Sequence, residues 1–95
     1  MKVVGRLIIV TYCQEHADLR NQVDVWLAEA DEATWRTPQD IKNRFRSASF
    51  LRDNRVVFNF KGNSYRLDTK IAYQQQVILI KRIGTHAEYS KWKFD

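Results

Sequence analysis

Residues 58–67 read Phe-Asn-Phe-Lys-Gly-Asn-Ser-Tyr-Arg-Leu, and this stretch decides the fold. From about Asn54 onward, apolar and polar residues alternate with the period of a β-strand. Residues 61–64 interrupt the alternation and predict a hairpin turn, in which Gly62 and Asn63 would supply the positive φ angles. The stretch therefore predicts two antiparallel strands joined by a tight turn.

The strand after the turn has one apolar and one basic face. Leu67 and Ile71 mark the odd-numbered face as core, so Arg66 and Lys70 share the opposite face. A glutamine-rich turn then leads into Val77–Ile83, an almost continuous apolar strand. The second half of the chain is thus predicted to be an antiparallel meander.

The first half has helical signals. Apolar residues at helical spacing predict an amphipathic helix, with Asp18 as a candidate N-cap. These residues are Leu19, Val23, Trp26, Leu27 and Ala30. A second helix is predicted to start with Thr37 as its N-cap and Pro38 at its first position, and to end near Arg46. Residues 47–50 are predicted to be a loop.

Two segments near the N-terminus are ambiguous on propensity alone. Residues 1–4 fit a short strand or an extended lead-in, and residues 6–15 fit either a strand or a helix. Trp92 and Phe94 are expected to pin the C-terminal tail to the core. We therefore predict an α+β fold, in which two or three N-terminal helices pack on a small antiparallel β-sheet, and a single domain spanning residues 1–95.

The basic charge lies in the sheet half. Residues 1–54 carry eight basic and eight acidic side chains, whereas residues 55–95 carry eight basic and three acidic ones. A localised positive surface indicates an anionic partner, with nucleic acid as the first candidate. The lone Cys13 excludes an intramolecular disulfide and a cysteine-rich zinc site. Since no apolar segment is long enough for a membrane span, we expect a cytoplasmic protein. The sequence has no metal-ligand spacing between His16 and His86, so we expect no metal or cofactor.

Three side chains are candidates for catalysis on a phosphodiester. Arg66 could clamp a phosphate, His86 could transfer a proton near neutral pH, and Tyr89 could transfer a proton or stack on a base. Each also has a structural interpretation: an arginine paired with Asp68 or a neighbouring strand, a solvated or capping histidine, and an aromatic ring packed on a terminal turn. Further basic residues are candidate RNA contacts. These are Arg55, Lys61, Lys70, Lys81, Arg82 and Lys91.

Several of these motifs resemble the HigB-type toxins of bacterial toxin–antitoxin pairs, within the RelE/ParE-like superfamily. The similarity is carried by residues 54–59, 62–67 and 84–89, and it extends back through residues 35–42 and Phe50. It implies N-terminal helices packed on a small antiparallel sheet, and it favours a helix at residues 6–15. The basic pair at residues 81–82 departs from the family pattern, which more often has one basic residue followed by an aromatic one.

The resemblance also implies a function. Such toxins are mRNA interferases that usually act in the ribosomal decoding site, without a metal, by attack of a 2′-hydroxyl on the adjacent phosphorus. Arg66 matches the arginine that stabilises phosphate charge, and His86 and Tyr89 match positions from which relatives transfer protons. The implied partners are a HigA-like helix-turn-helix antitoxin, mRNA and the ribosome, and operator DNA indirectly through the antitoxin.

Two other functions are compatible with the sequence. One is a ParE-like toxin that inhibits a topoisomerase and has no nuclease activity. The other is a non-catalytic module that binds RNA or protein. The set of Arg66, His86 and Tyr89 favours the endoribonuclease, because a pure binder needs no proton-transfer groups such as His86 and Tyr89.

Overall fold

The computed structural model describes residues 1–94, which form four α-helices, one 3₁₀ turn and five strands. In chain order these are β1 (Lys2–Val4), α1 (Arg6–Glu15), η1 (Ala17–Leu19), α2 (Arg20–Glu32), α3 (Pro38–Arg44), β2 (Ser49–Phe50), β3 (Arg55–Phe60), β4 (Tyr65–Ala72), β5 (Val77–Thr85) and α4 (His86–Tyr89). The α+β class predicted from the sequence is confirmed. No helix in the described part of the chain is long and apolar enough to cross a membrane.

The five strands form one sheet in the order β1-β5-β4-β3-β2. The pairs β2–β3, β3–β4 and β4–β5 are antiparallel, whereas β1 pairs with β5 in parallel, so the sheet is mixed. Gly5 makes the link from β1 to α1 with a φ of 98°, a left-handed value that glycine adopts without strain. A parallel edge strand supplied by the first residues is the part of the topology that the meander pattern did not predict.

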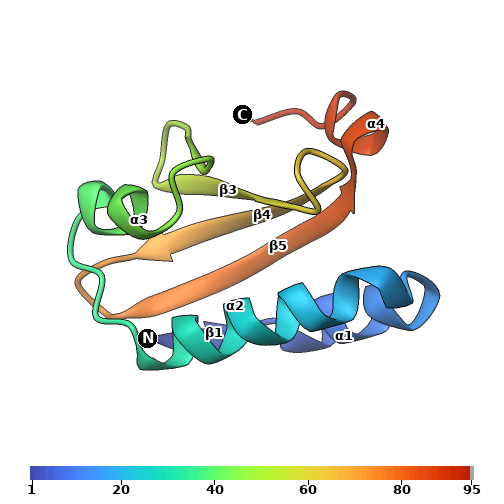
Figure 1. Cartoon of the computed structure of the whole chain (residues 1–95). Helices are drawn as coiled ribbons and strands as arrows, with labels where there is room; N and C mark the ends of the chain where they lie inside the picture. Colours follow the sequence, from blue (N-terminus) through green and yellow to red (C-terminus); the bar gives the residue numbers. More distant parts are fainter. Residues whose placement is uncertain (95) are drawn as a thin grey trace.

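Helices α1 and α2 cover one face of the sheet, and α4 with the C-terminal tail lies over the other (Figure 1). The core between helices and sheet is fully apolar at Trp26, Phe58, Leu67 and Ile78, each at most 2% exposed. Trp26 meets Phe58 edge-to-face with ring centres 5.1 Å apart, which fixes α2 against β3. We call the opposite face, where Arg66 lies, the open face.

The family resemblance predicted the first helix correctly, and local signals predicted the start of α3. The chain over residues 6–15 is helical, as the family resemblance implied. Thr37 caps α3 through a capping box with Asp40, and Pro38 occupies the first helical position. Leu27 is only partly buried, although it belongs to the predicted apolar stripe of α2. The amphipathic pattern therefore fixes the helix but overstates the width of its buried face.

Four details of the prediction are wrong. Asp18 does not cap α2: it lies in η1, and its carboxylate accepts a hydrogen bond from the Tyr65 hydroxyl at 3.4 Å. Part of the predicted loop is strand β2, which pairs with β3. The positive φ angles of the β3–β4 turn belong to Lys61 and Gly62, not to Asn63. The tail rings contact arginines of the open face rather than the core.

Candidate active site

The three predicted catalytic side chains lie together at one end of the open face. In the sheet register Arg66 of β4 stands between Asn59 of β3 and Gly84 of β5. Its guanidinium donates one hydrogen bond to Asn59 Oδ1, and its Nη2 lies 3.0 Å from His86 Nδ1. The guanidinium carbon is also 4.9 Å from the centre of the Tyr89 ring. The sheet and α4 thus place Arg66, His86 and Tyr89 in mutual contact.

Helix α4 begins where β5 ends because Thr85 is an effective N-cap. The Thr85 hydroxyl accepts a hydrogen bond from the Glu88 backbone N–H at 3.2 Å, and the Thr85 N–H donates to Glu88 Oε1 at 2.8 Å. The latter bond lowers the pKa of the Glu88 carboxyl. The His86 N–H donates to the Ser64 carbonyl at 2.9 Å, which ties α4 to the β3–β4 turn. His86 and Tyr89 then lie three residues apart on one side of a single helical turn.

Gly84 is required by packing at this site. A Cβ at position 84 would lie 2.9 Å from Trp92 Cζ2, closer than real Cβ contacts come, and 3.2 Å from Glu88 Cβ, which is a tight contact. Glycine therefore lets α4 and the tail approach β5 closely, and this approach brings His86 and Tyr89 over Arg66. The close approach of the tail to this position was not evident in the sequence.

Two of the predicted RNA contacts are used inside the protein. Asp68 is fully buried, and it accepts hydrogen bonds from Arg82 Nε at 2.8 Å and from Arg55 Nε at 3.1 Å. Arg82 also lies over the rings of Trp92 and Phe94, at 4.6 Å and 5.0 Å from their centres. Arg55 lies over the Phe94 ring as well, at 5.1 Å, so both arginines hold the tail on the open face. The Asp68 carboxylate balances one of their two charges.

The lysines predicted to contact RNA are all exposed. They are Lys61, Lys70, Lys81 and Lys91. Lys81 is the extra residue of a β-bulge, because Asp68 pairs with Arg82 and Thr69 pairs with Ile80. The bulge separates the two basic residues at this departure from the family pattern: Lys81 faces solvent, and Arg82 faces Asp68. Within residues 1–94, no side-chain hydrogen bond or ion pair joins Lys61 or Lys91 to Arg66, His86 or Tyr89.

A separate aromatic cluster lies beside α4. The Tyr12 and His16 rings are stacked at 3.9 Å, and Tyr65 meets both edge-on. Burial, and then the nearby Glu88 carboxylate, raise the pKa of Tyr12 to about 12. The Tyr12 hydroxyl donates to Glu88 Oε1 at 3.4 Å, so α1 supports α4 through a neutral phenol. His16 therefore has a structural role in this cluster, through its stacking on Tyr12.

Sequence reasoning missed the role of Asn59 and assigned the wrong possible partner to Asp68. Asn59 accepts from Arg66 and donates to the Ser47 carbonyl at 2.6 Å, so it orients the arginine from the neighbouring strand. Asp68 was considered as a partner for Arg66, but it binds Arg55 and Arg82 instead. Residues 1–94 contain no group of three His, Cys, Asp or Glu side chains that could hold a metal ion.

Comparison with known proteins identifies the family. A search of curated proteins found no match. A family model does match over residues 19–92, more than half of the chain, from η1 to the tail and including all three residues of the cluster. The chain therefore belongs to the HigB toxin family, the RelE-like toxic component of a toxin–antitoxin system.

Proposed function

We propose that this toxin is a ribosome-associated endoribonuclease that cleaves mRNA without a metal ion. The observation that carries the proposal is the contact of the Arg66 guanidinium with both His86 and Tyr89. These three groups can bind a phosphate, remove a proton and supply a proton, which are the needs of 2′-hydroxyl attack on phosphorus. Membership of a toxin–antitoxin family implies an antitoxin partner.

Arg66 is proposed to stabilise the phosphate. Its present partners, Asn59 Oδ1 and His86 Nδ1, are neutral acceptors, and its Nε is buried without a partner among the described residues. An anionic phosphoryl oxygen is a stronger acceptor than either neutral group. The arriving phosphate would therefore draw the guanidinium toward itself, where it meets the charge that grows in the transition state.

His86 is proposed as the general base. A guanidinium has no acceptor, so the contact at 3.0 Å requires Nδ1 of a neutral imidazole to accept from Arg66. When Arg66 turns to the phosphate, this lone pair is released and can take the proton of the 2′-hydroxyl. The exposed position of His86 at the start of α4 leaves its ring accessible to RNA.

Tyr89 is proposed as the general acid. Its hydroxyl would donate a proton to the 5′-oxygen while the bond from phosphorus to that oxygen breaks and the bond to the 2′-oxygen forms. The products are a 2′,3′-cyclic phosphate and a 5′-hydroxyl, and the proton lost by the 2′-oxygen resides on His86. The nearby Arg66 would stabilise the phenolate that remains.

The finer partners are also proposals. The exposed lysines of the sheet half fit a nucleic-acid surface, so we propose mRNA and the ribosome as the targets. A HigA-like helix-turn-helix antitoxin would neutralise the toxin and connect it indirectly to operator DNA. Catalysis on mRNA would take place in the cytoplasm.

The test is cleavage by Arg66→Ala and His86→Ala on programmed ribosomes, with mRNA 5′ ends mapped after induction in cells. Each variant should cleave about 100-fold more slowly. Arg66→Lys should rescue little, because a point charge does not reproduce the planar fork of guanidinium donors. Arg52→Ala is the matched control, since that side chain is 78% exposed and forms an exposed ion pair with Asp53.

The outcomes separate the alternatives. Wild-type cleavage by both Arg66→Ala and His86→Ala would contradict the catalytic assignment. Growth arrest by the wild type without new mRNA ends would favour the topoisomerase inhibitor. Binding of RNA with neither cleavage nor growth arrest would favour a non-catalytic module.

A further inference from the structure

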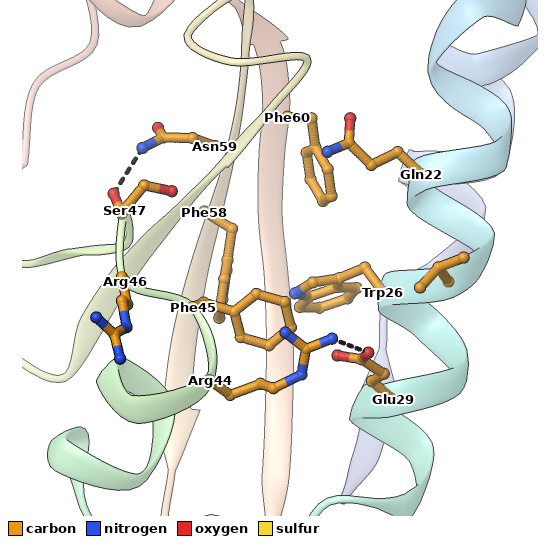
Figure 2. Close-up of a pocket in the computed structure, with 11 residues that line it drawn as sticks. Gln22, Trp26, Glu29, Arg44, Phe45, Arg46, Ser47, Phe58, Asn59 and Phe60 are labelled. Carbon is orange, nitrogen blue, oxygen red and sulfur yellow. Dashed lines mark hydrogen bonds and ion pairs between the residues drawn. The ribbon is translucent and has the colours of Figure 1, made fainter.

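A pocket of about 530 Å³ lies between α2, the segment that follows α3, and β3 (Figure 2). Its walls are the aromatic rings of Trp26, Phe45, Phe58 and Phe60, with Val25 at the rim. The volume lies within the range of small-molecule sites, and flat aromatic walls suit a planar ligand. This pocket is on the helix side of β3, away from the contact of Arg66 with His86.

Two polar atoms in this pocket have no partner in the described part of the chain. They are Nε1 of Trp26, which can only donate, and Oε2 of Glu29, which can only accept. Both are buried, and Trp26 as a whole is 2% exposed. Unpaired buried polar groups are rare, and finding a donor and an acceptor on the lining of one pocket indicates a missing ligand that carries the complementary pair.

We propose that this pocket binds a nucleobase of single-stranded RNA. A base has a flat π-face for the aromatic walls, and its edge carries both an acceptor for the indole N–H of Trp26 and a donor for the free Glu29 oxygen. The inference rests on the proposed function and deepens it, because it adds a base subsite to the proposed phosphate site.

The charge around the pocket favours RNA over a protein segment. Among the described residues, Arg44 and Arg46 are the basic side chains that line it and Glu29 is the acidic one. Arg44 closes the mouth through an ion pair with Glu29 in which the arginine is 57% exposed. Pairs of this kind are weak, so an entering base can displace Arg44, which is then free to meet the backbone phosphate.

Asn59 and Gln22 connect the pocket to the strands and turn that carry the proposed active site. Asn59 lines the pocket and accepts a hydrogen bond from Arg66 on the open face. Gln22, another lining residue, accepts from the backbone N–H of Lys61 at 2.7 Å, at the turn that leads into β4. Among the described residues, β2 pairs with β3 only at Val56 and Val57, so the rest of this β3 edge has no strand partner. A strand of RNA that passes this edge from Arg66 to the pocket would meet the hydrogen bond from Asn59 to the Ser47 carbonyl.

The free acceptor predicts which bases fit. Adenine, cytosine and guanine carry an exocyclic amino group that can donate to Glu29. Uracil has no amino group, and its single pairing-edge N–H lies between two carbonyls. A carboxylate repels the oxygens of those carbonyls. Bases with an amino group should therefore bind more tightly than uracil, and Glu29→Gln should reduce that preference about tenfold, because an amide can also donate to a uracil carbonyl.

The test follows the indole N–H signals of protein labelled with ¹⁵N-tryptophan during titration with 2′-O-methyl hexanucleotides of adenosine, cytidine or uridine. These probes lack the nucleophile, so occupancy is read independently of cleavage. The Trp26 signal should move downfield, and the Trp35 signal should not. Trp26→Phe, which keeps an aromatic ring but lacks the donor, should weaken binding of the adenosine probe five- to tenfold. Trp35→Phe, outside the pocket, is the control and should bind normally.

Each outcome of the titration supports or contradicts the base subsite. If saturating probe leaves the Trp26 signal in place and Trp26→Phe binds like wild type, the pocket is not a base subsite, whether or not the protein cleaves mRNA. If the antitoxin moves this signal and the RNA probes do not, the occupant is a protein and the inference is wrong. If the RNA probes move it in a protein that never cleaves mRNA, the pocket stands and the proposed function fails.

Discussion

Replacement of Asp68 by Asn tests how the open face is held together. The Asp68 side chain is fully buried, and its oxygens accept from Arg55 and Arg82, which are 17% and 34% exposed. Asparagine has the same shape but no charge, so two partly buried guanidinium groups lose their counter-ion. Breaking a buried ion pair in this way costs about 3–5 kcal/mol of unfolding free energy. Because Arg82 is partly exposed, we expect a loss at the lower end, about 3 kcal/mol.

The measurement is the free energy of unfolding in urea, with thermal melting as a second probe. A loss of about 3 kcal/mol in a domain of this size should lower the melting temperature by about 12 °C or more. The matched control is Asp31→Asn, which breaks the exposed pair of Asp31 with Arg6, whose side chains are 45% and 42% exposed, and should cost less than about 1 kcal/mol. Equal stability losses in Asp68→Asn and Asp31→Asn would refute the reasoning that burial makes the Asp68 network structural.

Three further predictions follow from single contacts. Gly84→Ala should cost about 1–3 kcal/mol of unfolding free energy, because the added Cβ meets Trp92. The cost should fall when Trp92 is also replaced by Ala. An unchanged cost in that background would show that contact with Trp92 is not the cause. The pKa of Tyr12 is raised to about 12, so the stability that its neutral phenol contributes is complete below its ordinary pKa of about 10 and is lost as pH rises toward 12. Between pH 9 and pH 11, the free energy of unfolding in urea should therefore fall more in wild type than in Tyr12→Phe. Equal losses in the two proteins would count against this role of Tyr12. Lys70→Gln should lower the salt dependence of RNA binding by about one unit of log–log slope, whereas Lys2→Gln, on the far edge strand, should not; identical slopes would exclude Lys70 from the RNA surface.

Elements defined by local pattern were predictable from the sequence. The capping signal at Thr37, the period of two in β3 and β4, and the apolar run of β5 each predicted the element that forms. These signals need only neighbouring residues, because a cap or an alternating strand is stabilised within a few positions of the chain. The predicted contact of Arg66, His86 and Tyr89 depended on the order of strands, and an antiparallel meander fixes that order.

Features that depend on distant partners were not predictable. Strand β1 is three residues long and becomes a strand only because β5 offers a free edge to it. Asp68 could pair with several arginines, and the bulge at Lys81 determines that Arg82 faces it. Gly84 has no special φ that a turn pattern would reveal; its role comes from the approach of Trp92, eight residues later. Each of these is set by tertiary packing rather than by local propensity.

The distribution of partners explains why Arg66, rather than the other open-face arginines, is suited to phosphate. Arg55 and Arg82 already face the Asp68 carboxylate, so a phosphate would have to compete with a buried anion for them. Arg66 faces only the neutral acceptors of Asn59 and His86, and its Nε lacks a partner in residues 1–94. A phosphoryl oxygen can therefore replace its partners at a gain in hydrogen-bond strength. Under the proposed function, the buried aspartate thus leaves Arg66 as the arginine for the phosphate, at the end of the sheet where α4 carries His86 and Tyr89.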